Sequence, residues 1–295
     1  MPNSPQVPMQ NPFQSCRLTI CAAVLSFFCL SPLWAMADSY ANGRPGDKTS
    51  ELRLIAAENA SDGLYHLGVE ITLKEGALTY WRQPGDAGVP PIFSFDGSDN
   101  LAKAEVLYPA PTRIKEDEGE AFGYREKVVF PLHVTPRDKT RPVALKLTAD
   151  YAVCERICIP AKSHVEMSLP PAHGDSQDAA VAAAEARVPR RLSEDEIARK
   201  LTLTPEKNSG TSASGAASWR LAWKDAAPAT DLFAEAPEGW YFETKKTALP
   251  NEFRIVAVET PTKDGASRVP VTLTLTGPQQ NFEFTLPLDA APAGR

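Results

Sequence analysis

The strongest constraint on the fold is a pattern of alternating apolar and polar residues on both sides of one close pair of cysteines. Apolar side chains recur at every second position over residues 143–149, upstream of Cys154, and at the same spacing over residues 159–169, downstream of Cys158. A period of two residues is typical of a β-strand with one buried face. The pattern predicts a hairpin with residues 155–157 at its tip and both sulfurs on its polar side.

The spacing of the two cysteines requires a turn between them. Four residues of one extended strand span about 13 Å, whereas a disulfide needs Cα atoms about 4.4–6.8 Å apart. A disulfide across a hairpin tip closes a very short loop, so it removes little entropy from the unfolded chain and stabilises weakly. Strained, exposed disulfides are also the reducible ones. Redox exchange therefore explains the placement of Cys154 and Cys158 better than stability does.

Two other interpretations of the cysteine pair stay open. The pair can be a static disulfide that pins the hairpin. It can also bind Cu(I) or Zn(II) together with His164, because thiolates and imidazole form a soft ligand set. The sequence contains no Gly-rich phosphate loop, no H-E-x-x-H and no G-x-S-x-G motif, so we expect no cofactor.

Residues 1–37 are expected to be a signal peptide. A single charged residue, Arg17, precedes an apolar run over residues 18–35, and the run ends in Ala-Met-Ala at 35–37, a pattern that signal peptidase cleaves. An uncleaved membrane anchor is the alternative. Cleavage removes three of the five cysteines and leaves only Cys154 and Cys158. We expect such an exported chain in the periplasm, an oxidising compartment in which the pair can form a disulfide.

The remaining sequence predicts an all-β chain with two domains. Short alternating strands and frequent turns over residues 45–170 favour a β-sandwich. Residues 171–218 predict a joining segment with two short helices, at 178–187 and, from a capping box, at 193–201, followed by a flexible Gly/Ser-rich stretch. Strand patterns return in a second, smaller β domain at 219–290. The formal net charge of −6 argues against a nucleic-acid partner.

Several ordered motifs accompany the cysteine hairpin. They are YWRQPGDAG at 80–88, YPAP at 108–111, GYR at 123–125 and the Ile-Pro pair at 159–160. Together they resemble the N-terminal periplasmic domain of the DsbD thiol:disulfide interchange family, and most closely its ScsB-like branch. The resemblance covers residues 45–170 and extends, more weakly, to the second β domain.

The resemblance implies an immunoglobulin-like sandwich, followed by a smaller β-sandwich-like domain, that acts as a protein-disulfide reductase. Electrons would arrive from a membrane thiol-disulfide transporter of the DsbD or CcdA type and leave to periplasmic thioredoxin-like proteins. Cys158 would form the mixed disulfide with the partner, and Cys154 would resolve it. The sequence lacks the transmembrane and thioredoxin segments of full-length relatives, so the chain would work with separate partner proteins.

The resemblance also assigns roles to two further pairs of residues. On its own, the acidic stretch at 115–120 is a solvated loop, but Asp117 and Glu118 resemble the family's acidic pair and would transfer protons during exchange. Phe122 and Tyr124 correspond to the aromatic cap that shields the disulfide. The competing function is a non-catalytic periplasmic interaction module, or a copper- or zinc-handling module, with a structural disulfide.

Overall fold

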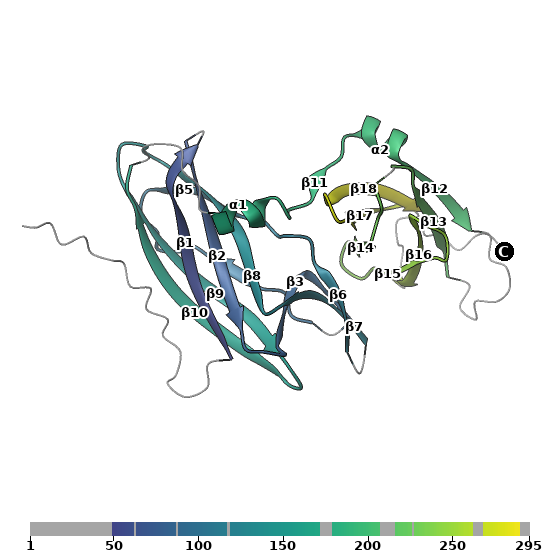
Figure 1. Cartoon of the computed structure of the whole chain (residues 1–295), viewed down its shortest axis with the longest axis horizontal. Coiled ribbons are helices and arrows are strands. Elements are labelled where there is room, and N and C mark those ends of the chain that lie inside the picture. The colour runs from purple at the N-terminus through teal and green to yellow at the C-terminus, as the bar shows by residue number, and fades with distance from the viewer. Residues whose placement is uncertain are drawn as a thin grey trace, which may run out of the picture. The chain divides into compact units, whose positions relative to one another are not determined.

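The computed structural model describes residues 49–289, except for residues 62, 87, 117–118, 172–178, 207–215, 226 and 262–267. Within this part the chain forms two β-sandwiches and two short helices, as Figure 1 shows. The predicted all-β fold class, an immunoglobulin-like sandwich followed by a smaller one, is therefore confirmed. The predicted signal peptide lies outside the described residues.

The first sandwich contains strands β1 to β10 in two sheets. One sheet has the order β1 (Ser50–Ser61), β2 (Leu64–Leu73), β8 (Lys127–Pro136) and β5 (Leu101–Val106). The other has the order β10 (Cys158–Leu169), β9 (Val143–Cys154), β3 (Leu78–Gly85), β7 (Gly119–Arg125) and β6 (Thr112–Glu116), with β4 (Ile92–Ser94) also paired to β9. The pairing of β9 with β10 is antiparallel over its whole length.

The core of the first sandwich lies between its two sheets. On β9, every second residue over 143–149 is at most 1% exposed, as the alternating pattern predicts. Phe130 of β8 is fully buried, and its ring packs against those of Phe93, Tyr108 and Tyr124 at centroid distances of 5.3–5.4 Å. Edge-to-face contacts of this kind favour one arrangement of the rings.

The second sandwich has two sheets of four strands each. One has the order β11 (Arg190–Arg191), β18 (Phe282–Asp289), β17 (Arg268–Thr276) and β14 (Asp231–Glu235). The other has the order β12 (Leu201–Glu206), β13 (Ser218–Trp223), β16 (Glu252–Glu259) and β15 (Tyr241–Lys246). Because β12 pairs with β13 along its length, this sandwich begins before residue 219, within the segment predicted as a linker.

Two helices precede β12, close to the predicted positions. They are α1 (Ala179–Glu185) and α2 (Glu194–Lys200). The Ser193 side chain accepts a hydrogen bond from the amide of Glu196, and the Glu196 carboxylate accepts one from the amide of Ser193. This is the predicted capping box. In the described part of the chain, no helix has the length and apolar character needed to span a membrane.

Phe233 of β14 joins the second sandwich to the core of the first. Its side chain is fully buried, and its ring meets Phe122 at 5.0 Å and Trp81 at 5.9 Å between centroids. Since β14 pairs with β17 of the second sandwich, this side chain couples the two cores through apolar contact.

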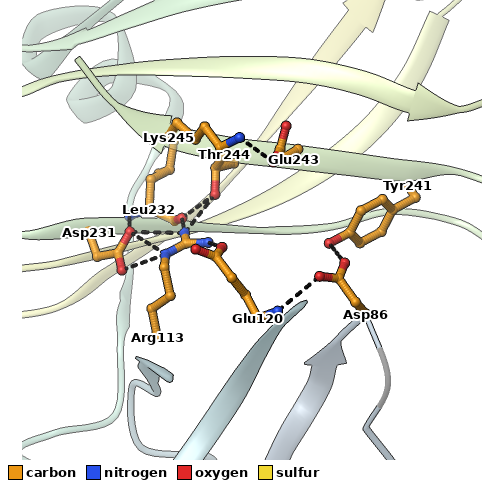
Figure 2. A network of polar contacts seen from close by, with 9 residues as sticks. All are labelled: Asp86, Arg113, Glu120, Asp231, Leu232, Tyr241, Glu243, Thr244 and Lys245. Carbon is orange, nitrogen blue, oxygen red and sulfur yellow. Dashed lines mark hydrogen bonds and ion pairs between the residues drawn. The ribbon is translucent and has the colours of Figure 1, made fainter. Parts of the chain in front are cut away.

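Arg113 of β6 reinforces this connection. Figure 2 shows its guanidinium between Asp231, the Leu232 carbonyl, the Thr244 hydroxyl and Glu120. The contacts to Asp231 and Glu120 are 3.0 and 2.6 Å. Burial alone would lower the pKa of Arg113, but the hydrogen bonds and charge of Asp231, and then of Glu120, outweigh it and raise the pKa. The guanidinium therefore stays charged and fully engaged.

Two further polar contacts also connect the first sandwich to the second. Arg82 of β3 donates two hydrogen bonds of 2.7 Å to the Glu235 carboxylate and also contacts Glu283. The Tyr241 hydroxyl donates to Asp86 at 2.5 Å, as Figure 2 shows. The bidentate pair of Arg82 with Glu235 fixes the relative orientation of the two side chains and also adds stability.

We expect Phe233→Ala to lower the free energy of unfolding by about 3–5 kcal/mol, because it leaves a cavity beside Trp81 and Phe122. Chemical denaturation followed by tryptophan fluorescence measures this. Leu249→Ala is the control, since Leu249 is 54% exposed and should change stability by less than about 0.5 kcal/mol. A loss below about 1 kcal/mol for Phe233→Ala would contradict the coupling of the two cores.

Candidate active site

The cysteine pair lies at the tip of the hairpin formed by β9 and β10. The register places Cys154 directly opposite Cys158, and Glu155-Arg156-Ile157 connect them, as the sequence predicts. The two Cα atoms are 4.0 Å apart, and the sulfurs form a disulfide. Each arm of the hairpin is twelve residues long, so extended pairing holds the two cysteines in register.

The two sulfurs have different environments. Cys154 is 2% exposed, whereas Cys158 is exposed. Cys154 alternates along β9 with Tyr151 and Val153, whose side chains belong to the main core, so it faces the other side of the sheet, as predicted. That side is not polar here, because Cys154 packs in a small apolar cluster with Leu78, Tyr80, Ile114, Ala121 and Ala152. Of the two cysteines, only Cys158 is therefore accessible from solvent.

Tyr80 of β3 contacts the disulfide directly. Its hydroxyl donates to Cys154 Sγ at 3.0 Å and lies 3.4 Å from Cys158 Sγ. Burial, followed by the charge of Glu116, raises the pKa of Tyr80, so the hydroxyl keeps its proton at neutral pH. When the disulfide opens at Cys158, negative charge appears on Cys154, and a donor already aimed at that sulfur stabilises the thiolate.

The position of Tyr80 depends on close packing of its strand. The Thr79 hydroxyl donates to the Ala152 carbonyl at 2.9 Å, which fixes β3 against β9 beside the disulfide. On the other side of β3, a Cβ at position 123 would lie 2.1 Å from the Thr79 carbonyl oxygen. Only glycine permits this approach of β7. Tyr80 opens the YWRQPGDAG motif and Gly123 opens GYR, so both motifs lie at this site, although no pattern in the sequence indicates that Tyr80 contacts the sulfurs.

The structure does not bring Phe122 and Tyr124 to the disulfide. Phe122 packs on Phe233, and the Tyr124 hydroxyl donates to the Pro109 carbonyl at 2.7 Å within the main core. Both residues alternate along β7 with Ala121, which packs with Cys154. Their rings therefore lie on the opposite face of the sheet. The aromatic side chain that shields the disulfide is Tyr80.

The predicted acidic pair, Asp117 and Glu118, lies outside the described residues. Glu116, which precedes them at the end of β6, does act on the site, because its charge contributes to the raised pKa of Tyr80. The acidic stretch therefore has an electrostatic influence on the residue that contacts the sulfurs.

His164 lies far from the two cysteines. It pairs with Thr148 six positions along β10 from Cys158, and its Nδ1 is 2.9 Å from the Thr148 hydroxyl. Six residues of extended strand span about 20 Å. The structure therefore does not assemble the alternative metal site of Cys154, Cys158 and His164.

Apolar surface borders the exposed sulfur. Ile157 is 77% exposed and Ile159 is 45% exposed, and they flank Cys158 in the sequence. Both also line a shallow depression with Ala77 and Val153 and with the polar residues Thr49, Lys74, Glu155 and Arg156; neither cysteine lines it. Large exposed apolar side chains that gather in one place are typical of a surface that another protein covers.

A disulfide at a hairpin tip, with one exposed and one buried sulfur on an immunoglobulin-like sandwich, is an arrangement that can exchange with the thiols of another protein. Residues 51–170 match the family model described as the N-terminal domain of the thiol:disulfide interchange protein DsbD. This match confirms the resemblance read from the motifs and supports disulfide oxidoreductase activity in general.

Among solved structures, the N-terminal periplasmic domain of ScsB from Proteus mirabilis is similar over both sandwiches. The match covers 86% of this chain and 99% of that one, with a TM-score of 0.63 and 18% sequence identity; at this identity it shows the fold. The C-terminal domain of the BspA polypeptide from Streptococcus agalactiae matches at a TM-score of 0.18 and 9% identity, over 85% of this chain and 99% of that one. This likeness is too weak to indicate a shared fold. Comparison with curated proteins gives no match.

We expect Tyr80→Phe to raise the pKa of the Cys154 thiol in the reduced protein by about 1 to 2, because a hydrogen bond to a charged group contributes about 1.5–3 kcal/mol. The ultraviolet absorbance of the thiolate, followed against pH in a Cys158→Ser background, measures Cys154 alone. Tyr65→Phe is the control, since it removes a hydroxyl that donates to the Pro170 carbonyl elsewhere. Equal pKa values in both variants would exclude thiolate stabilisation by Tyr80.

Proposed function

We propose that this chain is a periplasmic electron relay that exchanges thiols and disulfides through Cys154 and Cys158. The observation that carries the proposal is the asymmetry of the disulfide: Cys158 is open to a partner, and Cys154 is buried against the Tyr80 hydroxyl. The match to a thiol:disulfide interchange family supports the chemistry. The expected signal peptide and the likeness to a periplasmic domain support the compartment.

Reduction of the relay begins at the exposed sulfur. A thiolate of a membrane thiol-disulfide transporter attacks Cys158 Sγ, the disulfide bond breaks, and the electron pair leaves with Cys154 Sγ. A second transporter thiolate then attacks the transporter sulfur of this mixed disulfide and releases Cys158 as a thiolate. Two electrons, with two protons from solvent or nearby acids, pass to the chain, and the transporter keeps a disulfide.

Delivery reverses these steps on a thioredoxin-like protein. The Cys158 thiolate attacks a disulfide sulfur of the partner and releases one partner thiolate. The Cys154 thiolate then attacks Cys158 Sγ, which reforms the intramolecular disulfide and releases the second partner thiolate. Asp117 and Glu118 are assigned to proton transfer in these steps, since they adjoin Glu116, whose charge reaches Tyr80.

A trapping experiment tests the order of attack. Reduced Cys154→Ser should form a covalent mixed disulfide with an oxidised thioredoxin-like protein, because its Cys158 attacks but no second thiol resolves the product. Reduced Cys158→Ser should form little or none, because Cys154 is buried. Non-reducing electrophoresis detects the complex, and dithiothreitol should separate the two proteins by reducing the mixed disulfide. Trapping by Cys158→Ser alone would reverse the assigned roles, and trapping by neither variant would contradict the relay.

Ile157, the exposed residue that precedes Cys158 at the hairpin tip, should contribute to partner docking. We expect Ile157→Asp to lower kcat/KM for exchange with a thioredoxin-like protein about 10- to 100-fold, because it removes roughly 1.5–3 kcal/mol of apolar burial from the complex. The rate of disulfide reduction by dithiothreitol should stay near that of the wild type, since a small thiol needs no docking surface. Val258→Asp, at a residue that is 53% exposed in the second sandwich, is the matched control. An unchanged kcat/KM for Ile157→Asp would show that Ile157 is not part of the docking surface.

A further inference from the structure

A second cluster of functional groups lies on the sheet that does not carry the cysteines. His66 of β2 and His133 of β8 are direct cross-strand partners, with ring centroids 4.6 Å apart. Glu185, the last residue of α1, places Oε1 2.7 Å from His66 Nδ1 and 2.9 Å from His133 Nε2. One ligand atom from each residue lies within 4.8 Å of the other two. Three elements thus bring two imidazoles and a carboxylate to one point.

The fold keeps these side chains together. His66 and His133 alternate with Leu67 and Leu132, which are fully buried in the core, so the two imidazoles are on the outer face of the sheet. Helix α1 lies against β2 and β8 on this face. The three polar side chains are only 19–25% exposed. The cluster is therefore partly buried and preformed.

Close packing of α1 fixes the distance of Glu185 from the sheet. Val181 is fully buried, and it packs over Gly68, where a Cβ would lie 3.3 Å from Val181 Cγ2 and 2.6 Å from Val129 Cγ1. The absence of a side chain at Gly68 lets the helix approach, and Glu185 follows Val181 by one helical turn.

We propose that His66, His133 and Glu185 bind one divalent zinc-type ion. Two imidazoles and a carboxylate are a ligand set that tetrahedral Zn²⁺ uses when a fourth position holds water. Ligands at about 2.0–2.2 Å from zinc stand roughly 3.3–3.6 Å from one another in that geometry, so the two nitrogen–oxygen distances must lengthen by about 0.5 Å. The three ligand atoms, which now lie within 4.8 Å of one another, would have to adjust to that spacing by side-chain rotation.

One further carboxylate lies beside the cluster, and two cations act on it. Glu105 of β5 is the register partner of His133, and its carboxylate interacts electrostatically with that imidazole. Lys103 pairs with Glu105 at 2.5 Å, and Arg191 acts on it from further away, which offsets part of the negative charge.

Calorimetric titration of the oxidised chain without residues 1–37, which contain the other three cysteines, with Zn²⁺ tests this site. The disulfide removes both thiolates as ligands, and a Cys154→Ser/Cys158→Ser variant should bind zinc equally well. We expect one zinc per chain, and an affinity at least about tenfold weaker in His66→Ala, His133→Ala and Glu185→Gln. His164→Ala, which removes an exposed histidine of the other sheet, is the matched control and should keep the affinity of the wild type.

Thermal unfolding provides a second readout that needs no activity. Zinc should raise the Tm of the wild-type chain and of His164→Ala, because a ligand that binds only the folded state stabilises it. Zinc should leave the Tm of Glu185→Gln unchanged. This variant retains the size of the side chain and a hydrogen-bond acceptor, so we expect it to fold. No zinc binding by the wild type, or equal binding by all variants, would overturn the proposal and leave a hydrogen-bonded contact between α1 and the sheet.

Discussion

The chemistry of this chain depends on the register of the hairpin β9–β10. A slip of one residue would turn one cysteine to the opposite face of the sheet, and the two sulfurs could no longer meet. The apolar residues at 143–149 oppose such a slip, because they are fully buried on the core face. The two sulfurs are nevertheless unequal, since Cys154 ends the buried stretch 151–154 and Cys158 begins the exposed stretch 158–160.

The strands that support the disulfide also contact the second sandwich. On β3, Tyr80 reaches the sulfurs and Arg82 binds Glu235. On β6, Ile114 packs in the apolar cluster around Cys154, while the adjacent Arg113 donates to Asp231. The second sandwich thus stabilises the strands that hold the disulfide and its hydrogen-bond donor, although none of its described residues contacts the two sulfurs.

Local patterns predict local structure well here, and contacts between distant strands poorly. The hairpin and the capped helix at Ser193 follow from spacing over a few residues. The burial of Cys154 does not, because four of its five apolar neighbours come from three other strands of the sheet, β3, β6 and β7. The motif around Phe122 pointed to the correct strand but not to the correct face, which only the pairing of β7 decides. His66 and His133 are 67 positions apart, and no local pattern predicts that they are cross-strand partners.

The reduction potential of the Cys154–Cys158 pair tests the central claim most directly. The purified chain without residues 1–37 can be equilibrated in a glutathione or dithiothreitol series and assayed by the mass shift of alkylation. An electron relay predicts a potential of about −180 to −270 mV, the range of proteins that exchange disulfides. A potential below about −300 mV would mean a structural disulfide that partners cannot reduce and would contradict the account.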